Sequence, residues 1–503
     1  MRHDLLILFF ILLSSALMAD EHSNEAPSFK VQGIVTDEKG EGLPGASVWV
    51  KGTVVGAGTN AKGEFSFKLS SKNKCVLRVS FTGYEPQERE VTPGVDSLYR
   101  FVLESSNNAL NEVVITGTRT LKPLKDVPVL TRVISSEDIA QVNPLDLQSL
   151  LEYEMPGLQF GLAHGSGLPE LKFQGSAGGY VLFMIDGERV AGEGSSNNID
   201  YSLIDMDNVE RIEIVKGPMS TLYGSQAMGG VVNIITKDAN RPFTGNVSVR
   251  YGNNDESKYS LSLGTKQGRF SALTSLSYRK RDAYALKDKE GQIEYSYYKD
   301  IYGRDSVVAD TSEKGMSSVN GFEIWQANQK LSYTFNENFR ISLNGTYYNN
   351  DVLEYVEQKE KDRFSNYSIN PRVYYAINDS HILDFSYVFE NYEKRYVYTT
   401  SLPSKKVFGD LTNTVRLNYT GYIHEKHTLT AGIEVNTQKL QHYWFDNGSG
   451  KKFDAQTYVL YLQEDYKVSD SFSVLAGVRS DCHSKYGFHA SPKISLMYKY
   501  GVL

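Results

Sequence analysis

The sequence predicts a mainly β protein whose second half is an antiparallel transmembrane β-barrel. From Gly245 to Leu503, runs such as "FSALTSLSY" and "ISLNGTYYN" alternate apolar and polar residues, so that each strand has one face of each kind. These runs are about ten to fifteen residues long, whereas strands of globular proteins average about five or six. Short connections ("KQG", "NEN", "NDS") take turns with longer ones, of which the longest runs from Asp282 to about Val319. This pattern is typical of outer-membrane barrels, whereas a soluble sandwich would not sort its connections by length.

The amino terminus predicts export. A basic start precedes an uncharged apolar run from Leu5 to Ala19, which is shorter than the about 20 residues that a membrane-spanning helix needs. We therefore expect residues 1–19 to be a signal peptide and the domain that follows to be periplasmic. The net charge of −7 argues against a nucleic-acid partner.

Residues 29–104 predict a small β-sandwich. Short strand-like runs ("VQGIVTD", "GEFSFKL", "CVLRVSFTGY") are separated by glycine-containing turns ("EKGEG", "NAKGE"). The stretches "VQGIVTDEKGEGLPGASVWVKGT" and "GTNAKGEFSF" resemble the carboxypeptidase-regulatory-like domain. This resemblance implies no peptidase, because the only His-x-x-Glu match, His22 to Glu25, lies in a polar stretch after the signal peptide. Cys75 and the distant Cys482 are both expected to be small apolar fillers.

A polar linker and a short β-branched run occupy residues 105–120. The linker contains "SSNNALN", and "EVVITGTRT" follows it. A β-branched run after a flexible linker can add a strand to the sheet edge of another protein. It can equally be the last strand of the first domain, and the residue pattern alone leaves both interpretations open.

Residues 121–240 predict a mixed α/β unit. Asn143 and Pro144 are expected to cap and begin a helix, because both residue types are common at these two positions. "YVLFMIDGERV" is expected to form two strands joined by a tight turn at Asp186 and Gly187.

The last part of this unit, "VERIEIVKGPMSTLYGSQAMGGVVNIITK", places glycines between two β-branched strands. A phosphate-binding loop needs Lys and Ser/Thr directly after its last glycine, whereas Gly224 is followed by Ser225 and Gly230 by Val231. Glycine also permits close backbone approach and unusual dihedral angles, so we interpret the motif as structural. Its residues are Gly217, Pro218, Tyr223, Gly224, Gly229 and Gly230.

The same stretch resembles the end of the plug domain of TonB-dependent outer-membrane receptors. "DVPVLTRVISSEDI", "LQSLLEYEMPGLQF" and "VLFMIDGERV" resemble further plug motifs in the family's order, and the resemblance covers residues 111–503. It implies a monomeric transporter in outer-membrane lipid, with no catalytic residues, cofactor or metal, that takes up a scarce, large ligand. Its periplasmic partner would be TonB with the ExbB/ExbD motor, which draws on the proton gradient. TonB would pair with the TonB box, for which the candidates are Glu112, Val113, Val114, Ile115, Thr116, Gly117 and Thr118.

The plug wording "KGPMSTLYG" and "AMGGVVNIITK" resembles the siderophore, haem and cobalamin branch of that family. The alternatives are an oligosaccharide importer of the starch-utilisation type, which would add a surface lipoprotein partner, and a receptor without transport. By family topology the ligand would contact outward plug loops, and loop tyrosines can stack on an aromatic chelator. A solvated loop histidine and ordinary barrel-loop tyrosines are the competing interpretations. The expected ligand-binding residues are Phe160, His164, Ser166, Glu193, Ser195, Asn197, Tyr295, Tyr297 and Tyr298.

The number of predicted strands departs from the family. We count about twelve strands before Leu503, whereas the family's barrels close with about 22. A half-barrel leaves two open edges in lipid, which unpaired backbone groups make unfavourable. The hypothesis from the sequence is therefore an inactive, truncated chain that lacks roughly ten strands. "HEKH" (His424–His427) lies in a short predicted turn, and we expect it to be solvated rather than metal-binding.

Overall fold

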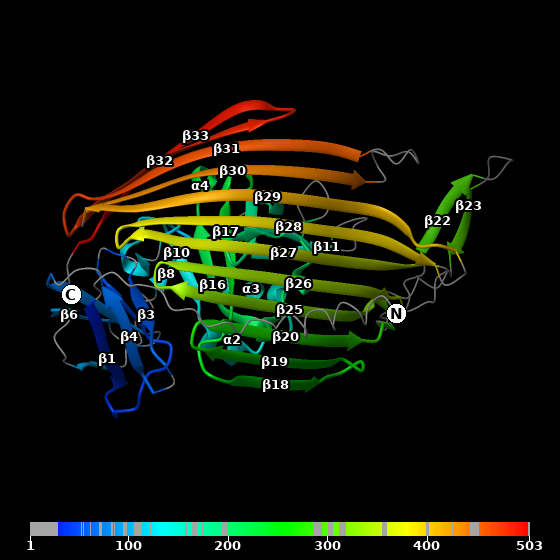
Figure 1. Cartoon of the computed structure of the whole chain (residues 1–503). Coiled ribbons are helices and arrows are strands. Elements are labelled where there is room, and N and C mark those ends of the chain that lie inside the picture. Colours follow the sequence, from blue (N-terminus) through cyan, green and yellow to red (C-terminus); the bar gives the residue numbers. More distant parts are fainter. Residues whose placement is uncertain are drawn as a thin grey trace.

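The computed structural model shows a mainly β chain with a small domain, a central α/β unit and one large antiparallel sheet (Figure 1). The structure describes residues 29–500 apart from 52, 54, 61, 70–72, 82–83, 85, 94–97, 105–112, 121, 156–157, 163–168, 174–175, 193–198, 286–293, 300–304, 311–317, 355–359, 399–401, 425 and 443–451. Within this described part, the chain contains no helix that is long and apolar enough to cross a bilayer.

The amino-terminal domain is a β-sandwich of two sheets. One sheet has the order β4 (Glu64–Leu69), β1 (Phe29–Asp37), β7 (Tyr99–Leu103), and the other β3 (Gly56–Gly58), β2 (Ser47–Val50), β5 (Cys75–Ser80), β6 (Gln87–Val91). Alternate side chains from both sheets, among them Val35, Leu77 and Phe101, are fully buried in one apolar core.

The central unit, from β9 to β17 and called the plug below, is built on a five-stranded sheet. Its order is β10 (Thr131–Ile134), β16 (Val209–Lys216), β17 (Gly230–Thr236), β14 (Val181–Ile185), β15 (Glu188–Arg189). The other elements are β9 (Lys122–Pro123), η2 (Leu124–Asp126), α2 (Ser136–Val142), α3 (Leu147–Glu154), β11 (Leu158–Leu162), β12 (Pro169–Phe173), β13 (Ser176–Ala177), η3 (Gly178–Tyr180), η4 (Tyr201–Leu203), η5 (Met206–Asn208), α4 (Ser220–Tyr223) and η6 (Ser225–Ala227). Asp186 and Gly187 have φ angles of 51° and 83°, so the predicted tight turn is confirmed.

The prediction that Asn143 caps the start of a helix is wrong. Asn143 ends α2 in the left-handed conformation, at φ 48°. Asp146 caps α3, because its carboxylate accepts the backbone N–H of Ser149 at 2.9 Å. Sequence inspection missed α2, although Ser135 and Asp138 form a capping box at its start.

The large sheet, called the barrel sheet below, has twelve antiparallel strands that follow one another in the order in which they occur along the chain. They are β18 (Thr244–Tyr251), β19 (Ser257–Gln267), β20 (Phe270–Arg281), β25 (Gly321–Asn336), β26 (Phe339–Leu353), β27 (Glu360–Asn378), β28 (His381–Tyr398), β29 (Lys405–His424), β30 (His427–His442), β31 (Lys452–Lys467), β32 (Phe472–His483) and β33 (Gly487–Tyr498). The long connection after β20 carries two small pairs, β21 (Tyr284–Ala285) with β24 (Ser318–Val319) and β22 (Glu294–Lys299) with β23 (Asp305–Asp310).

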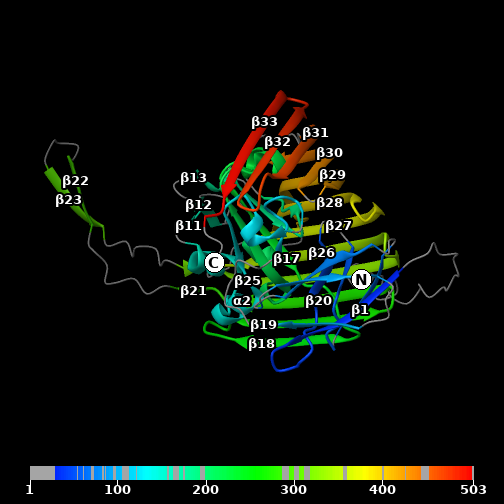
Figure 2. The ribbon, with the colours of Figure 1, turned by 90° about the vertical axis from the view of Figure 1, so that its left-hand side faces the viewer.

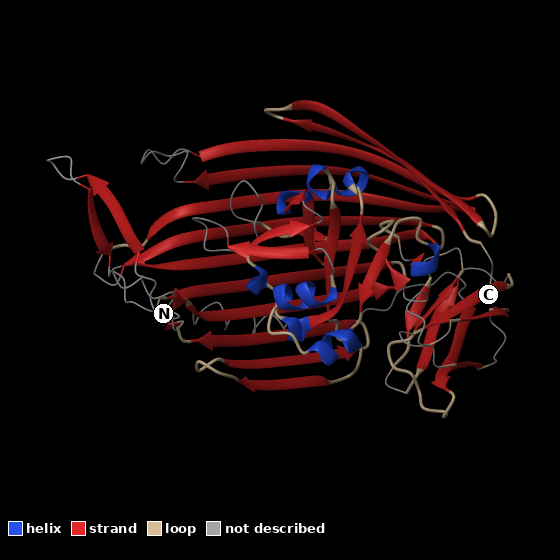
Figure 3. Ribbon diagram, turned by 180° about the vertical axis from the view of Figure 1, so that it is seen from behind, coloured by secondary structure: helices blue, strands red, loops and turns tan. Residues whose placement is uncertain are grey.

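The barrel sheet exposes apolar side chains and buries polar ones, which is the reverse of a soluble protein. The plug gathers beside one face of the sheet (Figures 2 and 3). Apolar Leu276 and Ile433 are 45% and 53% exposed, whereas polar Ser277 and Thr430 are 5% and 2% exposed. An apolar outer face and a polar inner face are what a strand needs when lipid replaces water outside.

The amino-terminal domain contacts the barrel sheet at the end that carries the short connections (Figure 1). The backbone N–H of Lys68 donates to the Glu337 carboxylate, in the turn between β25 and β26, at 3.1 Å.

Candidate functional site

The segment that begins at Val113 lies at the junction of plug and barrel sheet. Strand β8 (Val113–Val114) pairs antiparallel with β9, not with the first domain's sheets. Val114 and Thr116 are 0% exposed, and Thr118 is 1% exposed. Glu112, the first residue of the predicted TonB box, lies outside the described residues. The described part of the predicted box is thus largely buried.

The carboxylate of Glu213 holds this segment. Glu213 lies in the middle of β16, where strand alternation puts it on the same side as Arg211. Its Oε2 accepts the backbone N–H groups of Ile115 at 3.0 Å and Thr116 at 2.9 Å, and the Thr116 hydroxyl at 2.7 Å. Arg211 donates to the other oxygen from Nε at 2.9 Å and Nη2 at 2.8 Å. Because Glu213 is 0% exposed, these donors replace the hydration that a buried charge loses.

Three further side chains satisfy the segment's polar groups. The Tyr223 hydroxyl donates to the Thr116 carbonyl at 3.0 Å, and Asn233 Nδ2 donates to the Thr116 hydroxyl at 2.9 Å. From β31, Gln463 Nε2 donates to the Thr118 carbonyl at 3.1 Å. Burial raises the pKa of Tyr223 to about 12, so its hydroxyl keeps its proton at neutral pH.

Arg119 connects the end of the segment to both the plug and the barrel sheet. Its guanidinium lies 4.6 Å from the centre of the Tyr223 ring on the plug and 4.8 Å from that of Tyr461 on β31. It also donates to the Leu222 carbonyl at 2.9 Å and to Asn418 Oδ1 at 3.4 Å. The segment is therefore fixed to plug and barrel sheet together.

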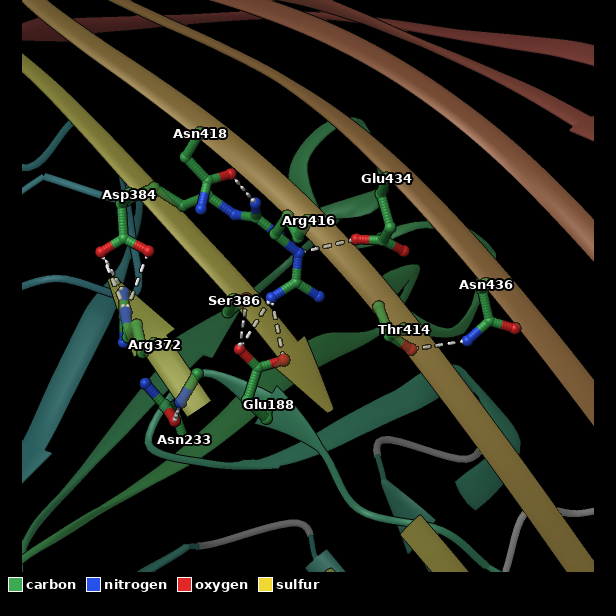
Figure 4. A network of polar contacts seen from close by, with 12 residues as sticks. Glu188, Asn233, Arg372, Asp384, Ser386, Thr414, Arg416, Asn418, Glu434 and Asn436 are labelled. Atoms are coloured by element: carbon green, nitrogen blue, oxygen red, sulfur yellow. Dashed lines mark hydrogen bonds and ion pairs between the residues drawn. The ribbon is translucent and has the colours of Figure 1, made fainter. Parts of the chain in front are cut away.

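A buried ionic network links the plug to the middle of the barrel sheet (Figure 4). Glu188, next to the tight turn, accepts two hydrogen bonds from Arg416 Nη1 of β29, at 3.0 and 2.9 Å. Arg416 Nε donates to Glu434 of β30 at 2.8 Å, and Ser386 donates to Glu188 at 3.3 Å. Arg416 thus pairs with one carboxylate of the plug, Glu188, and one of the barrel sheet, Glu434.

Two plug aspartates contact barrel strands in opposite electrostatic settings. Asp200 accepts the Ser202 hydroxyl at 2.5 Å and also the Tyr348 hydroxyl of β26, and burial raises the pKa of Asp200. Asp207 lies 2.8 Å from Lys258 of β19. Burial alone would raise the pKa of Asp207, but Lys258, the Ser260 hydroxyl and Arg250 together outweigh burial and lower it.

A cavity of about 110 Å³ with a mixed polar and apolar lining lies between the plug and strands β20 to β28. Its lining includes the amides Asn208, Asn328, Asn344, Asn366 and Asn370 and the carboxylate of Glu390. Within the described structure, the Oδ1 atoms of Asn328, Asn366 and Asn370 have no hydrogen-bond partner. These oxygens are shielded from solvent, so the residues around the cavity include acceptors that the described structure leaves without a donor.

The structure does not gather the predicted ligand-binding residues into one described site. Phe160 packs edge-on against Tyr201 at 4.8 Å in the plug core. Tyr295, Tyr297 and Tyr298 lie on β22, in the long connection after β20. The remaining predicted residues lie outside the described part of the chain: His164, Ser166, Glu193, Ser195 and Asn197.

The glycine motif brings backbones and side chains close together. Gly224 has a φ of 87°, and a Cβ there would lie 3.3 Å from the Arg479 guanidinium of β32. A Cβ on Gly230 would lie 2.6 Å from the Val215 carbonyl oxygen. In the same motif, Gly217 has a φ of 104°, and Pro218 follows it. Gly229 donates its N–H to the Tyr180 carbonyl at 2.8 Å.

Neither histidines nor cysteines form a metal site in the described residues, where no group of three or more potential ligands occurs. His424 and His427 pair across the hairpin of β29 and β30, and His427 contacts Glu464 at 2.8 Å. Both cysteines are free. Cys482 is exposed, so its prediction as an apolar filler is wrong.

Sequence inspection missed the residues that organise this junction. Arg211 and Glu213 belong to the stretch from Val209 to Lys237, in which the sequence analysis assigned a role to Gly217, Pro218, Tyr223, Gly224, Gly229 and Gly230 but not to these two residues. The available signal was a glutamate, Glu213, between the apolar residues Ile212 and Ile214, two positions after Arg211. No such signal marks Glu188 or Asn233, whose partners come from distant strands.

Two protein-family models match the chain. The model described as "TonB-dependent Receptor Plug Domain" matches residues 123–231, and the model described as "CarboxypepD_reg-like domain" matches residues 31–115.

Curated relatives include receptors and transporters. The chain is 26% identical over 397 residues to a vitamin B12 transporter of Vibrio vulnificus, covering 77% of this chain and 60% of that protein. It is 24% identical over 405 residues to the iron-regulated outer membrane virulence protein of Vibrio cholerae, covering 76% and 56%. It is 30% identical over 268 residues to the TonB-dependent receptor SusC of Bacteroides thetaiotaomicron, covering 52% and 25%. The chain therefore spans less than two thirds of the length of these relatives.

Solved structures share the fold. The ferric enterobactin receptor of Pseudomonas aeruginosa superposes with a TM-score of 0.60 at 19% identity, covering 73% of this chain and 59% of that chain. The siderophore receptor PiuA of Acinetobacter baumannii gives a TM-score of 0.55 at 15% identity, covering 77% and 64%.

Proposed function

Because the chain has the plug domain and the fold of TonB-dependent receptors, we propose that it serves energised uptake of a scarce, large ligand across the outer membrane. The ligand class is an iron chelate, haem or cobalamin. TonB in the periplasm pairs with residues 112–118 and draws on the inner-membrane proton gradient. The chain performs no covalent chemistry, and its relatives are transporters and receptors.

The observation that carries this proposal is the position of the segment from Val113 to Thr118. It follows a polar linker, begins with a two-residue strand, and is bonded to both the plug sheet and the barrel sheet. If a partner added a strand to β8, it would therefore act on a segment that contacts both the plug and the barrel sheet. A pull on it would be transmitted to β16, the strand that lies between β10 and β17 in the plug sheet.

The ligand class is supported by the names of the relatives. Two of them are a vitamin B12 transporter and an iron-regulated outer-membrane protein, each matched over about three quarters of this chain. The apolar outer face of the barrel sheet supports an outer-membrane location.

A growth experiment tests the proposal. The gene is deleted in its native host, and growth is measured with iron restricted to ferric siderophore or haem, and with cobalamin as the limiting vitamin. We expect a defect in one of these media that wild-type protein restores. Val114→Pro should not restore growth, because proline removes the N–H needed to pair a strand. Full growth of the deletion strain in all three media would overturn the proposal.

An oligosaccharide importer is the second candidate. It is favoured by the 30% identity to SusC over 268 residues and by the neutral amides that line the cavity. A growth defect restricted to polysaccharide media would select this candidate.

A further inference from the structure

We propose that Glu213 is a positioning residue that divides the predicted TonB box into two parts, a strand ending at Val114 that a partner can pair with and an anchored part, residues 115–118. The carboxylate sets the force or signal needed to free the anchored part. This inference rests on the proposed function of residues 112–118.

The two parts are held by different interactions. Val113 and Val114 are held through two backbone pairings with β9, in a two-stranded sheet that has no other strand in the described structure. One edge of β8 is therefore unpaired among the described elements, as strand addition requires. Beyond Val114, bonds from side chains replace strand pairing.

A single carboxylate oxygen accepts three hydrogen bonds from the anchored part. Glu213 Oε2 accepts three hydrogen bonds from Ile115 and Thr116, at 3.0, 2.9 and 2.7 Å. Hydrogen bonds to a charged acceptor are about twice as strong as neutral ones. Two successive backbone N–H groups aimed at one anion also form a concave anion-binding arrangement.

Burial makes the release cooperative. Glu213 is fully buried, so departure of residues 115 and 116 would leave a carboxylate with Arg211 as its donor on the other oxygen. A buried charge that loses its hydrogen-bond donors is strongly unfavourable, so the loss of any one of these bonds raises the free energy of the partly released segment. The segment therefore stays docked until several bonds break together, and a partner meets a fixed boundary at Val114.

Replacement by glutamine removes this arrangement without changing the side chain's size. A glutamine at 213 has one acceptor oxygen and one NH₂ group. If the oxygen faces Thr116, the NH₂ faces the Arg211 guanidinium, and if the amide is turned, the NH₂ faces two N–H groups. Either orientation places donors against donors.

The test measures how often the anchored part opens, with a reporter thiol in native outer membranes. Cys75 and Cys482 are replaced by serine, Thr118→Cys supplies the reporter, and a maleimide labels it. Because Thr118 is 1% exposed, we expect slow labelling that E213Q accelerates about tenfold or more. The matched control is E210Q, which changes an exposed glutamate of the same strand, β16, and which should leave the rate within about twofold.

A second variant covers the case in which E213Q does not fold. Thr116→Val keeps the carboxylate and removes one of the three bonds, so labelling should rise, but less than in E213Q. Thermal unfolding of each variant shows whether the effect is local. Equal labelling of wild type, T116V and E213Q, or an equal rise in E210Q, would overturn the role of Glu213.

Capture of the purified periplasmic domain of TonB separates this inference from the proposed function. If both hold, E213Q captures more TonB domain than wild type without ligand. Faster labelling without greater capture would retain the Glu213 anchor and reject residues 112–118 as the TonB box. Unchanged labelling together with capture by wild type would reject the anchor alone.

Discussion

Glu188 of the plug and Arg416 of β29 form a buried pair across the plug–barrel boundary, with N–O distances of 3.0 and 2.9 Å, although 228 residues separate them in the sequence. Their side chains are 12% and 11% exposed, so water contributes little to their solvation. Arg416 also compensates Glu434. The pair is therefore one of several ion pairs, such as Lys258–Asp207, that hold the plug against the barrel sheet.

Removal of the cation should loosen the plug strongly. Arg416→Met removes the ion-pair partner that Glu188 and Glu434 share, although Glu434 keeps Arg479 at 3.9 Å. We expect the free energy of unfolding to fall by about 3–5 kcal/mol, as for other broken buried pairs. The measurement is a urea titration in detergent. Ser386→Ala is the control, because it removes one neutral donor to Glu188 and should cost about 1 kcal/mol. Equal losses in the two variants would contradict the account.

Tyr223→Phe should increase opening around Thr116. The change leaves a buried carbonyl without its donor, at a cost of about 1–3 kcal/mol. Hydrogen–deuterium exchange of a peptide covering residues 113–120 should become faster by at least tenfold, about 1.4 kcal/mol. Tyr486→Phe, at a tyrosine that is 76% exposed, is the control and should leave that exchange unchanged.

The plug should become less stable as pH rises through the folded pKa of Asp200. Burial raises that pKa above the ordinary value of 3.8, so the neutral carboxyl is favoured in the folded state. The stabilisation is therefore complete below pH 3.8 and is lost as pH rises through the raised folded value. Asp200→Asn should remove this contribution. Urea midpoints measured from pH 3.5 to 8 for both proteins check it, and parallel curves would exclude Asp200 as the cause.

Gly224→Ala should destabilise the plug and displace Arg479. The φ of 87° and ψ of −174° belong to a region open almost only to glycine, and a Cβ would lie 3.3 Å from the guanidinium. We expect a loss of about 1–3 kcal/mol in thermal or urea unfolding. Gly245→Ala is the control, since a Cβ there meets neighbours only at ordinary distances of 3.5 and 3.6 Å. A neutral G224A would refute the structural interpretation of this glycine.

The barrel sheet was predictable because strand alternation is a local property. Leu343 and Tyr347, four residues apart in β26, share one face because side chains alternate along a strand. The length of each alternating run of apolar and polar residues then indicates the length of the strand. The predicted count of about twelve strands agrees with the twelve of the barrel sheet. The tight turn at Asp186 and Gly187 was equally local. Asn143 misled because asparagine serves both as a helix start and, in the left-handed conformation, as a helix end.

The junction could not be predicted because its partners are distant. Thr116 and Glu213 lie 97 residues apart, and Thr118 and Gln463 lie 345 residues apart. Each residue is unremarkable in its local sequence, and only the register of β16 against β10 and β17 brings Glu213 under the segment. Local patterns thus identify strands, while the anchoring carboxylate is visible only in the assembled structure.

The most direct test of the central claim is a cross-link between residue 112 and TonB in living cells. Glu112→Cys is introduced after Cys75 and Cys482 are replaced by serine, and TonB carries single cysteines in its periplasmic domain. The account predicts a disulfide-linked complex that Val114→Pro abolishes and that Lys125→Cys, at an exposed site thirteen residues further on, does not form. Equal cross-linking from residues 112 and 125, or none from either, would contradict energy coupling through residues 112–118.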